Sequence, residues 1–470
     1  MTISQICICL AIAVYLIAML GVGVWFSKRN NSVDDFYLGG RKLGPFVTAM
    51  SAEASDMSSW LLMGLPGVAY LSGLAEASWT AIGLAVGTYL NWLIVARRIR
   101  RYSHQIDAIT VPQFFSKRWG DERNLLSAIA AVVIMIFFVP YLASGFSACG
   151  KLFASLFGIN YVSAMLISAA VIVIYTVMGG FLAASFTDLV QSIIMTVALV
   201  VVLGFGVAQA GGMEAVMDNA RSLAGYLSLV NIHDPATGGS APYSLLTICS
   251  LLAWGLGYFG MPHILLRFMA IEEEKKLALS RRVATTWVVI SMGVAVFIGV
   301  VGNGMTKAGA MEQLSDAETI IVQLANLISC YGVPAALLAG VILAGILAAT
   351  MSTADSQLLA ASSSVSQNLA VEVLPPEDQR KEECAGGPEH HGGHLPDRSI
   401  SGPRPGQLCL PGGLIRLGGL RRRLRAGGAL CPVLEAVQQV GGTGRDGHRR
   451  RDGLRVEVSG GSYGRRAGHL

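Results

Sequence analysis

The sequence predicts an all-α membrane protein over residues 1–374, followed by a tail of different character. The chain is 53% hydrophobic and only 14% charged, whereas soluble domains carry about 25% charged residues. Apolar runs of about 20 residues, which suit a bilayer-spanning helix, recur before residue 375. All 7 Trp, 17 Met and 16 Phe also lie before residue 375. This composition argues against an ordinary soluble enzyme and against a disordered protein.

Nine apolar ranges are candidate membrane spans: 5–27, 45–72, 76–96, 125–157, 160–182, 188–210, 242–270, 283–305 and 331–358. If the N-terminus lies outside, alternating spans place 16 Lys and Arg residues on the inner side, Arg267 among them. Only Lys151, Arg221 and Lys307 then fall outside. Basic residues concentrate in cytoplasmic loops, so the sequence predicts this orientation for a multi-pass protein of the plasma membrane.

The second span is interrupted by the polar stretch 51–59, which contains Glu53 and Asp56. An ionised carboxylate near the bilayer centre costs about 2.5 kcal/mol or more, so the pair requires water, a cation or protonation. Lipid cannot satisfy the backbone groups that such a break exposes. The alternative is a helix that enters the membrane late and leaves these residues at the interface.

Two further ranges interrupt apolar spans. Residues 254–263 contain Gly255, Gly257, Gly260 and Pro262, which would disrupt a helix; the alternative is a kinked, tightly packed helix. Residues 349–356 are rich in Ser and Thr, which in membrane helices often only bond to carbonyls of their own helix.

Taken together, the three ranges predict a transporter with a binding site at mid-membrane. Paired discontinuous helices in corresponding halves of a chain indicate such a site. Range 45–72 would open one five-helix repeat ending at 210, and 242–270 would open a second. Hydroxyl and carbonyl oxygens suit a hard cation such as Na⁺, while half-helix N–H groups suit an anionic group such as a carboxylate. No Walker loop, zinc spacing or kinase motif occurs in the sequence, so we expect neither an enzyme nor a cofactor.

Several longer motifs carry a family resemblance: Tyr37-Leu38-Gly39-Gly40-Arg41, Ala54-Ser55-Asp56-Met57-Ser58, Trp60-Leu61-Leu62-Met63-Gly64, Gly179-Gly180-Phe181 with Thr187-Asp188, Trp254-Gly255-Leu256-Gly257-Tyr258 with Pro262-His263, and Met351-Ser352-Thr353. With these motifs, residues 1–374 resemble the sodium:solute symporter family, and within it the branch that transports proline. The resemblance implies a LeuT-type fold of inverted repeats, preceded by one extra helix.

The resemblance also implies residue roles. A Na⁺ site would be formed by backbone or hydroxyl oxygens of Ala54, Met57, Ala349, Ser352 and Thr353, with Asp56 as a carboxylate nearby. A proline pocket would be shaped by Ser58, Tyr141, Trp254, Tyr258 and Pro262. The ion path would include Ser55, Asp188 and Arg41. The sequence departs from the proline branch at Glu53, Ser59 and Met261, and Asp355 adds a carboxylate that could tune cation affinity or face water.

The implied activity is secondary active import of L-proline with Na⁺ by alternating access. The partners are then proline, Na⁺ as the coupling ion and the lipid bilayer, with no nucleic acid; the oligomeric state is not predicted. Two alternatives stay open. One is a sodium-coupled symporter for another small organic solute. The other is the membrane input domain of a sensor, which would require a signalling module.

The tail, residues 375–470, holds 21 of the 55 Gly and has 15 Arg against 1 Lys. The resemblance implies about four more spans beyond residue 374, yet no 20-residue apolar run follows. We therefore expect an incomplete second repeat, a disordered tail and an inactive chain. A shifted reading frame explains the abrupt change; a regulatory or nucleic-acid-binding tail and a tether to anionic lipid are the alternatives.

Overall fold

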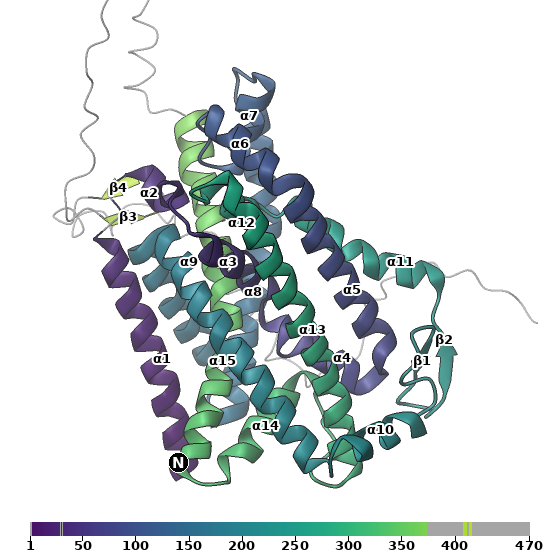
Figure 1. The fold of residues 1–470 in the computed structure, drawn as a ribbon. Coiled ribbons are helices and arrows are strands. Elements are labelled where there is room, and N and C mark those ends of the chain that lie inside the picture. Colours follow the sequence, from purple (N-terminus) through teal and green to yellow (C-terminus); the bar gives the residue numbers. More distant parts are fainter. Residues whose placement is uncertain (1, 29, 31, 374–407, 411–412, 416–470) are drawn as a thin grey trace, which may run out of the picture. The chain divides into compact units, whose positions relative to one another are not determined.

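The structure, a computed structural model, describes residues 2–28, 30, 32–373, 408–410 and 413–415. The first elements are α1 (Ile3–Ser27), α2 (Val33–Leu38), η1 (Gly39–Arg41), α3 (Pro45–Met57), η2 (Ser59–Leu61), α4 (Gly64–Ser72), α5 (Leu74–Asn91), the π-helical η3 (Trp92–Ala96), α6 (Arg97–Gln105), α7 (Val111–Trp119), α8 (Leu125–Phe157) and α9 (Tyr161–Gln209). Within this part, the chain is helical almost throughout (Figure 1).

The later elements are α10 (Met213–Ser222), β1 (Asn231–His233), β2 (Ser240–Pro242), α11 (Leu245–Ala253), η4 (Trp254–Phe259), α12 (Pro262–Ala270), η5 (Glu274–Lys276), α13 (Leu277–Lys307), η6 (Ala317–Thr319), α14 (Ile320–Ser329), α15 (Val333–Ser363) and the π-helical η7 (Ser364–Val373). Strands β1 and β2 pair antiparallel, as do β3 (Leu408–Leu410) and β4 (Gly413–Ile415). Apart from these last two strands, the predicted disordered tail lies outside the described residues.

Six helices in the described part are long and apolar enough to cross a membrane, or seven if the bent α11–α12 pair counts as one span. This is the architecture of a multi-pass membrane protein. The nine predicted ranges all contain helix, but the number of spanning helices differs for two reasons. Range 45–72 is divided among three short helices, and ranges 160–182 and 188–210 both lie within α9.

The 49-residue α9 reverses direction at Gly180, which has non-helical torsions of φ 61° and ψ −160°. Tyr175 lies against Gly23 of α1, and Gln191 donates a hydrogen bond to the Tyr15 hydroxyl of α1 at 2.9 Å. A continuous helix would separate Tyr175 from Gln191 by about 24 Å, but their partners on α1 are only about 12 Å apart along the helix axis. The two arms of α9 therefore correspond to two predicted spans.

Helices α1, α9 and α15 pack against one another, and α9 and α15 also pack on the interrupted helix α3 (Figure 1). Small residues allow their close approach: a Cβ on Gly340 of α15 would lie 2.6 Å from the Ala11 Cβ of α1. Most of α15 is buried, including every residue from Ile342 to Gln357.

The first predicted break is real: α3 ends at Met57 and the chain turns at Ser58, whose φ of 51° is rare for a residue with a side chain. The Ser58 hydroxyl accepts a hydrogen bond from the Trp60 N–H at 3.2 Å, which starts η2. The second predicted break is also real, because α11–η4 and α12 meet at 46°. Pro262 occupies the first turn of α12, where its missing N–H costs no helical hydrogen bond.

Segment η4 packs directly on α5 through glycine backbones. A Cβ built on Gly255 would lie 2.0 Å from the Gly83 carbonyl oxygen, and one on Gly87 would lie 2.3 Å from the Gly255 carbonyl oxygen. Any side chain at these positions would force the two elements apart. The contact holds the unwound segment beside α3, where the candidate site lies.

Candidate functional site

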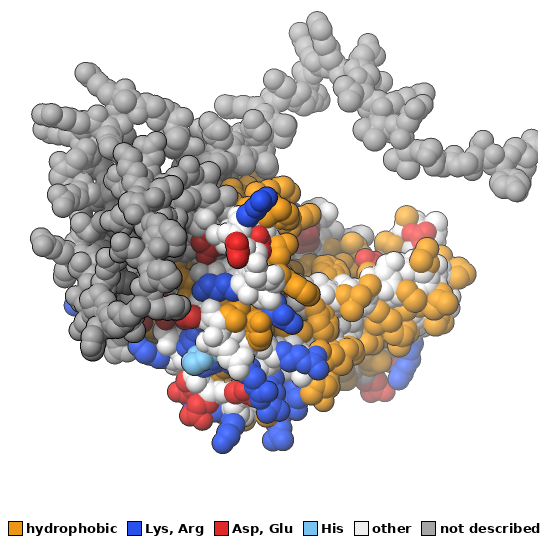
Figure 2. All heavy atoms as spheres, turned by 90° about the horizontal axis from the view of Figure 1, so that it is seen from above, with side chains coloured by type: hydrophobic (Ala, Val, Ile, Leu, Met, Phe, Trp, Pro, Cys, Tyr) orange, Lys and Arg blue, Asp and Glu red, His pale blue; other side chains and the backbone are white. Residues whose placement is uncertain are grey.

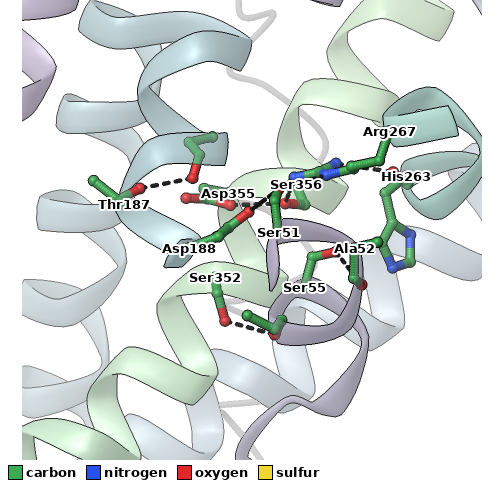
Figure 3. Close-up of polar contacts among 12 residues, drawn as sticks. Ser51, Ala52, Ser55, Thr187, Asp188, His263, Arg267, Ser352, Asp355 and Ser356 are labelled. Carbon is green, nitrogen blue, oxygen red and sulfur yellow. Dashed lines mark hydrogen bonds and ion pairs between the residues drawn. The ribbon is translucent and has the colours of Figure 1, made fainter. Parts of the chain in front are cut away.

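The end of α3 meets the middle of α15 through oxygen atoms. The Ser352 hydroxyl donates to the Ala54 carbonyl at 2.8 Å and to the Ala349 carbonyl at 3.2 Å. The Thr353 hydroxyl donates to the same Ala349 carbonyl at 3.3 Å. Figure 3 shows Ser352 of α15 directed toward α3. Four of the five residues proposed as Na⁺ ligands are thus gathered in one buried place.

Met57, the fifth proposed Na⁺ ligand, lies one turn after Ala54, at the end of α3, and is buried. It lines a neighbouring cavity of about 50 Å³ together with Asp56. The cavity therefore begins where the oxygen cluster ends.

The cavity contains most of the predicted proline pocket. Its lining is Asp56, Met57, Ser58, Trp60, Leu84, Tyr141, Trp254, Tyr258 and Met261. Pro262, the fifth predicted residue, is not part of this lining; it begins α12 directly after Met261. Trp60 was not assigned to the site from the sequence; its ring centroid is 5.2 Å from that of Trp254. An aromatic residue directly after a break is the sequence signal that could have identified it.

Polar side chains of the cavity are paired with each other. Tyr258 is hydrogen-bonded to Asp56, and Tyr141 to Ser58. Asp56 and Tyr258 are both buried. The cavity thus combines an apolar aromatic wall with a few placed polar groups, the usual composition of a small-molecule site.

A second polar cluster lies beside this site and joins α3, α9, α12 and α15 (Figure 3). Arg267 donates to the Asp188 carboxylate at 3.1 Å and to the Ser51 hydroxyl at 3.0 Å. Ser51 itself donates to the same Asp188 oxygen at 2.6 Å. The other Asp188 oxygen has no hydrogen-bond partner among the described residues. We call Ser51, Asp188, Arg267, Asp355 and Ser356 the arginine cluster.

Arg267, which the sequence counts among the basic residues of the inner side, has a buried position in the structure. It lies in the last turn of α12, and its side chain is fully buried because α3, α9 and α15 surround it. The same structure places Asp188, predicted for the ion path, in a buried ion pair.

Asp355 does not face water, which was one possibility raised by the sequence. It is fully buried and accepts hydrogen bonds from the hydroxyls of Tyr175 and Ser356. Arg267 also donates to Ser356. Asp188 thus pairs with the guanidinium directly, while Asp355 is linked to it only through the Ser356 hydroxyl. Buried charges require compensation of this kind.

Ser55 and Arg41, the other two residues predicted for the ion path, have local structural contacts. The buried Ser55 hydroxyl donates to the Ala52 carbonyl of its own helix at 3.0 Å. Arg41 donates to the carbonyls of Ala108 at 2.7 Å and Met269 at 3.0 Å. It thereby ties the loop after α2 to the ends of α6 and α12.

Glu53 lies on another side of α3. Its carboxylate accepts a hydrogen bond from the Trp92 indole N–H at 2.8 Å, and both side chains are buried. The Trp92 ring also packs edge-on against Phe268 of α12, with centroids 4.5 Å apart. The sequence singled out Glu53 as a departure from the proline branch but gave no sign of this partner.

Comparison with known proteins places the chain among transporters. A family model described as the sodium:solute symporter family matches residues 36–387. A sodium/proline symporter from Salmonella typhimurium is 42% identical over 364 residues, which cover 76% of this chain and 69% of that protein. A high-affinity proline transporter, PutP, from Bacillus subtilis is 43% identical over 352 residues, covering 75% and 71%.

A solved structure has the same fold. It is the substrate-bound, outward-open state of a Na⁺-coupled sialic acid symporter, with a TM-score of 0.65 and 21% sequence identity. The match covers 77% of this chain and 75% of that one. The fold is therefore of the LeuT type that the sequence predicted. On the evidence of the family model and these relatives, the chain belongs to the sodium:solute symporter family.

Proposed function

We propose that this protein imports L-proline together with Na⁺ across the bacterial plasma membrane by alternating access. The observation that carries the proposal is the junction of Ser352 with Ala54, which brings the end of a broken helix to a cluster of oxygen atoms beside a small cavity. The similar proteins named as proline transporters support proline as the substrate.

The oxygen cluster suits a small hard cation. Ala54 and Ala349 contribute carbonyl oxygens, and Ser352 and Thr353 contribute hydroxyl oxygens. When Na⁺ binds, the hydroxyls turn their lone pairs to the ion and give up their hydrogen bonds to the carbonyls. Met57 adds its carbonyl at the end of α3, and Asp56 lies close enough to add negative charge without being a ligand.

The cavity suits a small amino acid that is partly apolar. The rings of Trp60 and Trp254 form an apolar wall against which a pyrrolidine ring can pack. The amino group of the substrate then points to Asp56, and its carboxylate to backbone N–H groups at the start of η2 after Ser58, where a helix N-terminus favours negative charge.

Coupling follows from the shared segment. The end of α3 contributes both to the oxygen cluster and to the cavity, so Na⁺ that orders this segment also prepares the cavity for substrate. The effect must be reciprocal: Na⁺ tightens proline binding by the same factor as proline tightens Na⁺ binding.

Purified protein in liposomes tests the proposal. Because the tail of the present chain is expected to prevent transport, this and every other uptake measurement uses the protein translated in the restored reading frame after residue 374. Labelled L-proline uptake should require Na⁺, should not be supported by K⁺ or choline, and should be blocked by excess unlabelled proline. If another amino acid or a sugar inhibited the uptake and proline did not, that compound and not proline would be identified as the substrate. Uptake that is equal with and without Na⁺ would refute the proposal.

A further inference from the structure

A large groove, distinct from the substrate cavity, lies at the end of the molecule where α6 and α7 lie. Its volume is about 900 Å³, and it is formed by η3, α6, α7, η4 and α12. Basic side chains gather at this end of the molecule, with hydrophobic side chains beside them (Figure 2). The cation and substrate roles proposed above do not involve this groove.

One rim of the groove is strongly basic. It carries Arg97, Arg98, Arg101 and Arg118. Arg97 and Arg101 both contact Glu274, which neutralises one positive charge. Arg98 and Arg118 are exposed and make no ion pair within the described part of the chain. An excess of about three positive charges therefore faces whatever occupies the groove.

The opposite wall of the groove is apolar. The side chains of Leu93 and Ile94 are 46% and 40% exposed. Both belong to a helix that is long and apolar enough to span the bilayer. Phe259 and Leu265 line the inner end of the groove, on either side of the break between η4 and α12. The neighbour of such a wall within a membrane is an acyl chain.

Aromatic side chains mark the level of the membrane surface between these two parts. Tyr102 lines the groove and supports Arg118, whose guanidinium lies 4.9 Å from the ring centroid. Trp119 is 70% exposed beside it. Tyr and Trp concentrate at the interface between hydrocarbon and headgroups, so the arginines lie where lipid phosphates lie.

We propose that this groove binds an anionic phospholipid. The phosphodiester headgroup contacts Arg98 and Arg118, and one acyl chain lies along Leu93 and Ile94 toward Phe259. A basic rim joined to an apolar wall matches a lipid, whereas a free anion would use only the rim. Basic pockets between membrane helices on the cytoplasmic side are known to bind acidic headgroups.

The binding test uses the full chain purified in a neutral detergent. The protein is mixed with phosphatidylglycerol and with phosphatidylcholine of the same acyl chains, and retained lipid is measured by native mass spectrometry. We expect at least fivefold more bound phosphatidylglycerol. The variant R98Q/R118Q should lose that preference and leave the weak retention of phosphatidylcholine unchanged.

A matched control removes two charges from the same end outside the groove. Arg123 and Lys275 are exposed and do not line it, so R123Q/K275Q should retain the wild-type preference. If both double variants lose the preference equally, the effect is general surface charge and the proposal is overturned. Equal retention of the two lipids by the wild-type protein would also overturn it.

Two further measurements separate the lipid from a free anion and do not depend on the folding of a variant. Glycerophosphoglycerol and inorganic phosphate, which lack acyl chains, should not displace the bound lipid at millimolar concentration; displacement would indicate a simple anion site. Phosphatidylglycerol with a photoreactive acyl chain should label residues 93–99 and 114–118 of the wild-type protein. Labelling spread evenly over other membrane helices would contradict the assignment.

Discussion

Ser352 is the residue on which the proposed cation site most depends, because its hydroxyl reaches from α15 to the Ala54 carbonyl of α3. An oxygen contact to a charged group contributes about 1.5–3 kcal/mol, which is about tenfold or more in affinity. We expect S352A to raise the Na⁺ concentration for half-maximal proline uptake by at least tenfold. Sodium titration of uptake in liposomes measures this.

Ser363 provides the control on the same helix. It is also buried, but its hydroxyl donates only to the Ala360 carbonyl of its own helix, at 2.9 Å. The S363A variant should therefore keep the wild-type sodium dependence. A shift of the same size in both variants would mean that α15 is disturbed in general and that Ser352 has no special role.

Arg267 supplies the positive charge of the arginine cluster, so its removal should destabilise the cluster most. Removing one partner of a buried ion pair costs about 3–5 kcal/mol, because the other charge is left unpaired. We expect R267Q to lower the free energy of unfolding by about this amount. In D188N/R267Q the unpaired charge of Asp188 is also gone, so the loss should be clearly smaller than the sum of the two single variants. Unfolding of the four proteins in detergent measures the difference, and additive losses would contradict the pairing.

At the scale of elements, the contact of η4 with α5 is the most constrained. Overpacking a tight contact costs about 1–3 kcal/mol, and a Cβ on Gly255 would overlap the Gly83 carbonyl. We expect G255A to lower the unfolding temperature and to abolish most proline uptake. Gly257, in the same segment, has no atom within 4 Å of a built Cβ, so G257A should behave like the wild type. Equal damage in both would show that helix propensity, not contact, is at issue.

The junction of α6 with η5 has a predictable pH dependence. Hydrogen bonds from Arg101 and Arg97 lower the pKa of Glu274 from its usual 4.5 to about 2. Because the pKa in the folded state is lowered, the stabilisation by Glu274 is complete above about pH 4.5 and is lost as the pH falls toward 2.

The unfolding temperature of E274Q should lie slightly below that of the wild type at pH 7, and this difference should disappear as the pH falls from about 4.5 toward 2. A gap that stays constant from pH 7 to pH 3 would argue against the pairing. The effect is small because the pair is exposed and screened by salt.

The breaks in the helices could be predicted from the sequence, but their contacts could not. Glycine, proline and carboxylates inside apolar runs are visible as local violations of a membrane helix, so ranges 51–59 and 254–263 were identified correctly. The reversal inside α9 was expected between two separate spans, and it occurs at Gly180. By contrast, the partners of Arg267 come from three other elements. No local pattern shows such a partner, and counting charges therefore could not distinguish this buried, paired arginine from an exposed one.

At the scale of the whole molecule, the driving force sets a limit on transport. A membrane potential of 100 mV supplies about 2.3 kcal/mol per charge, and a tenfold Na⁺ gradient adds about 1.4 kcal/mol. With one Na⁺ per proline, vesicles should accumulate proline several hundredfold at most. Removing the potential with an ionophore should lower the accumulation about 50-fold. A much larger effect of the potential would require more than one Na⁺.

The composition of residues 375–470 bears on whether this chain is active. We propose that 1–374 is the transport core and that a shifted reading frame produced the tail. Translating the other two frames of the same DNA should then restore apolar spans. The restored protein should take up proline in liposomes while the present chain does not. Equal uptake by both would show that the tail is tolerated.

The glycine contact between η4 and α5 also determines where the second broken helix can flex. Backbone pressed on backbone has no rotamers to rearrange, so η4 cannot slide along its neighbour without separating from it. We therefore expect any tilt of α12 to pivot at Gly260 and Met261, the two residues between the halves. In this arrangement α12 would rotate as a rigid helix about a fixed point at its N-terminus, and Arg267, in its last turn, would move the farthest.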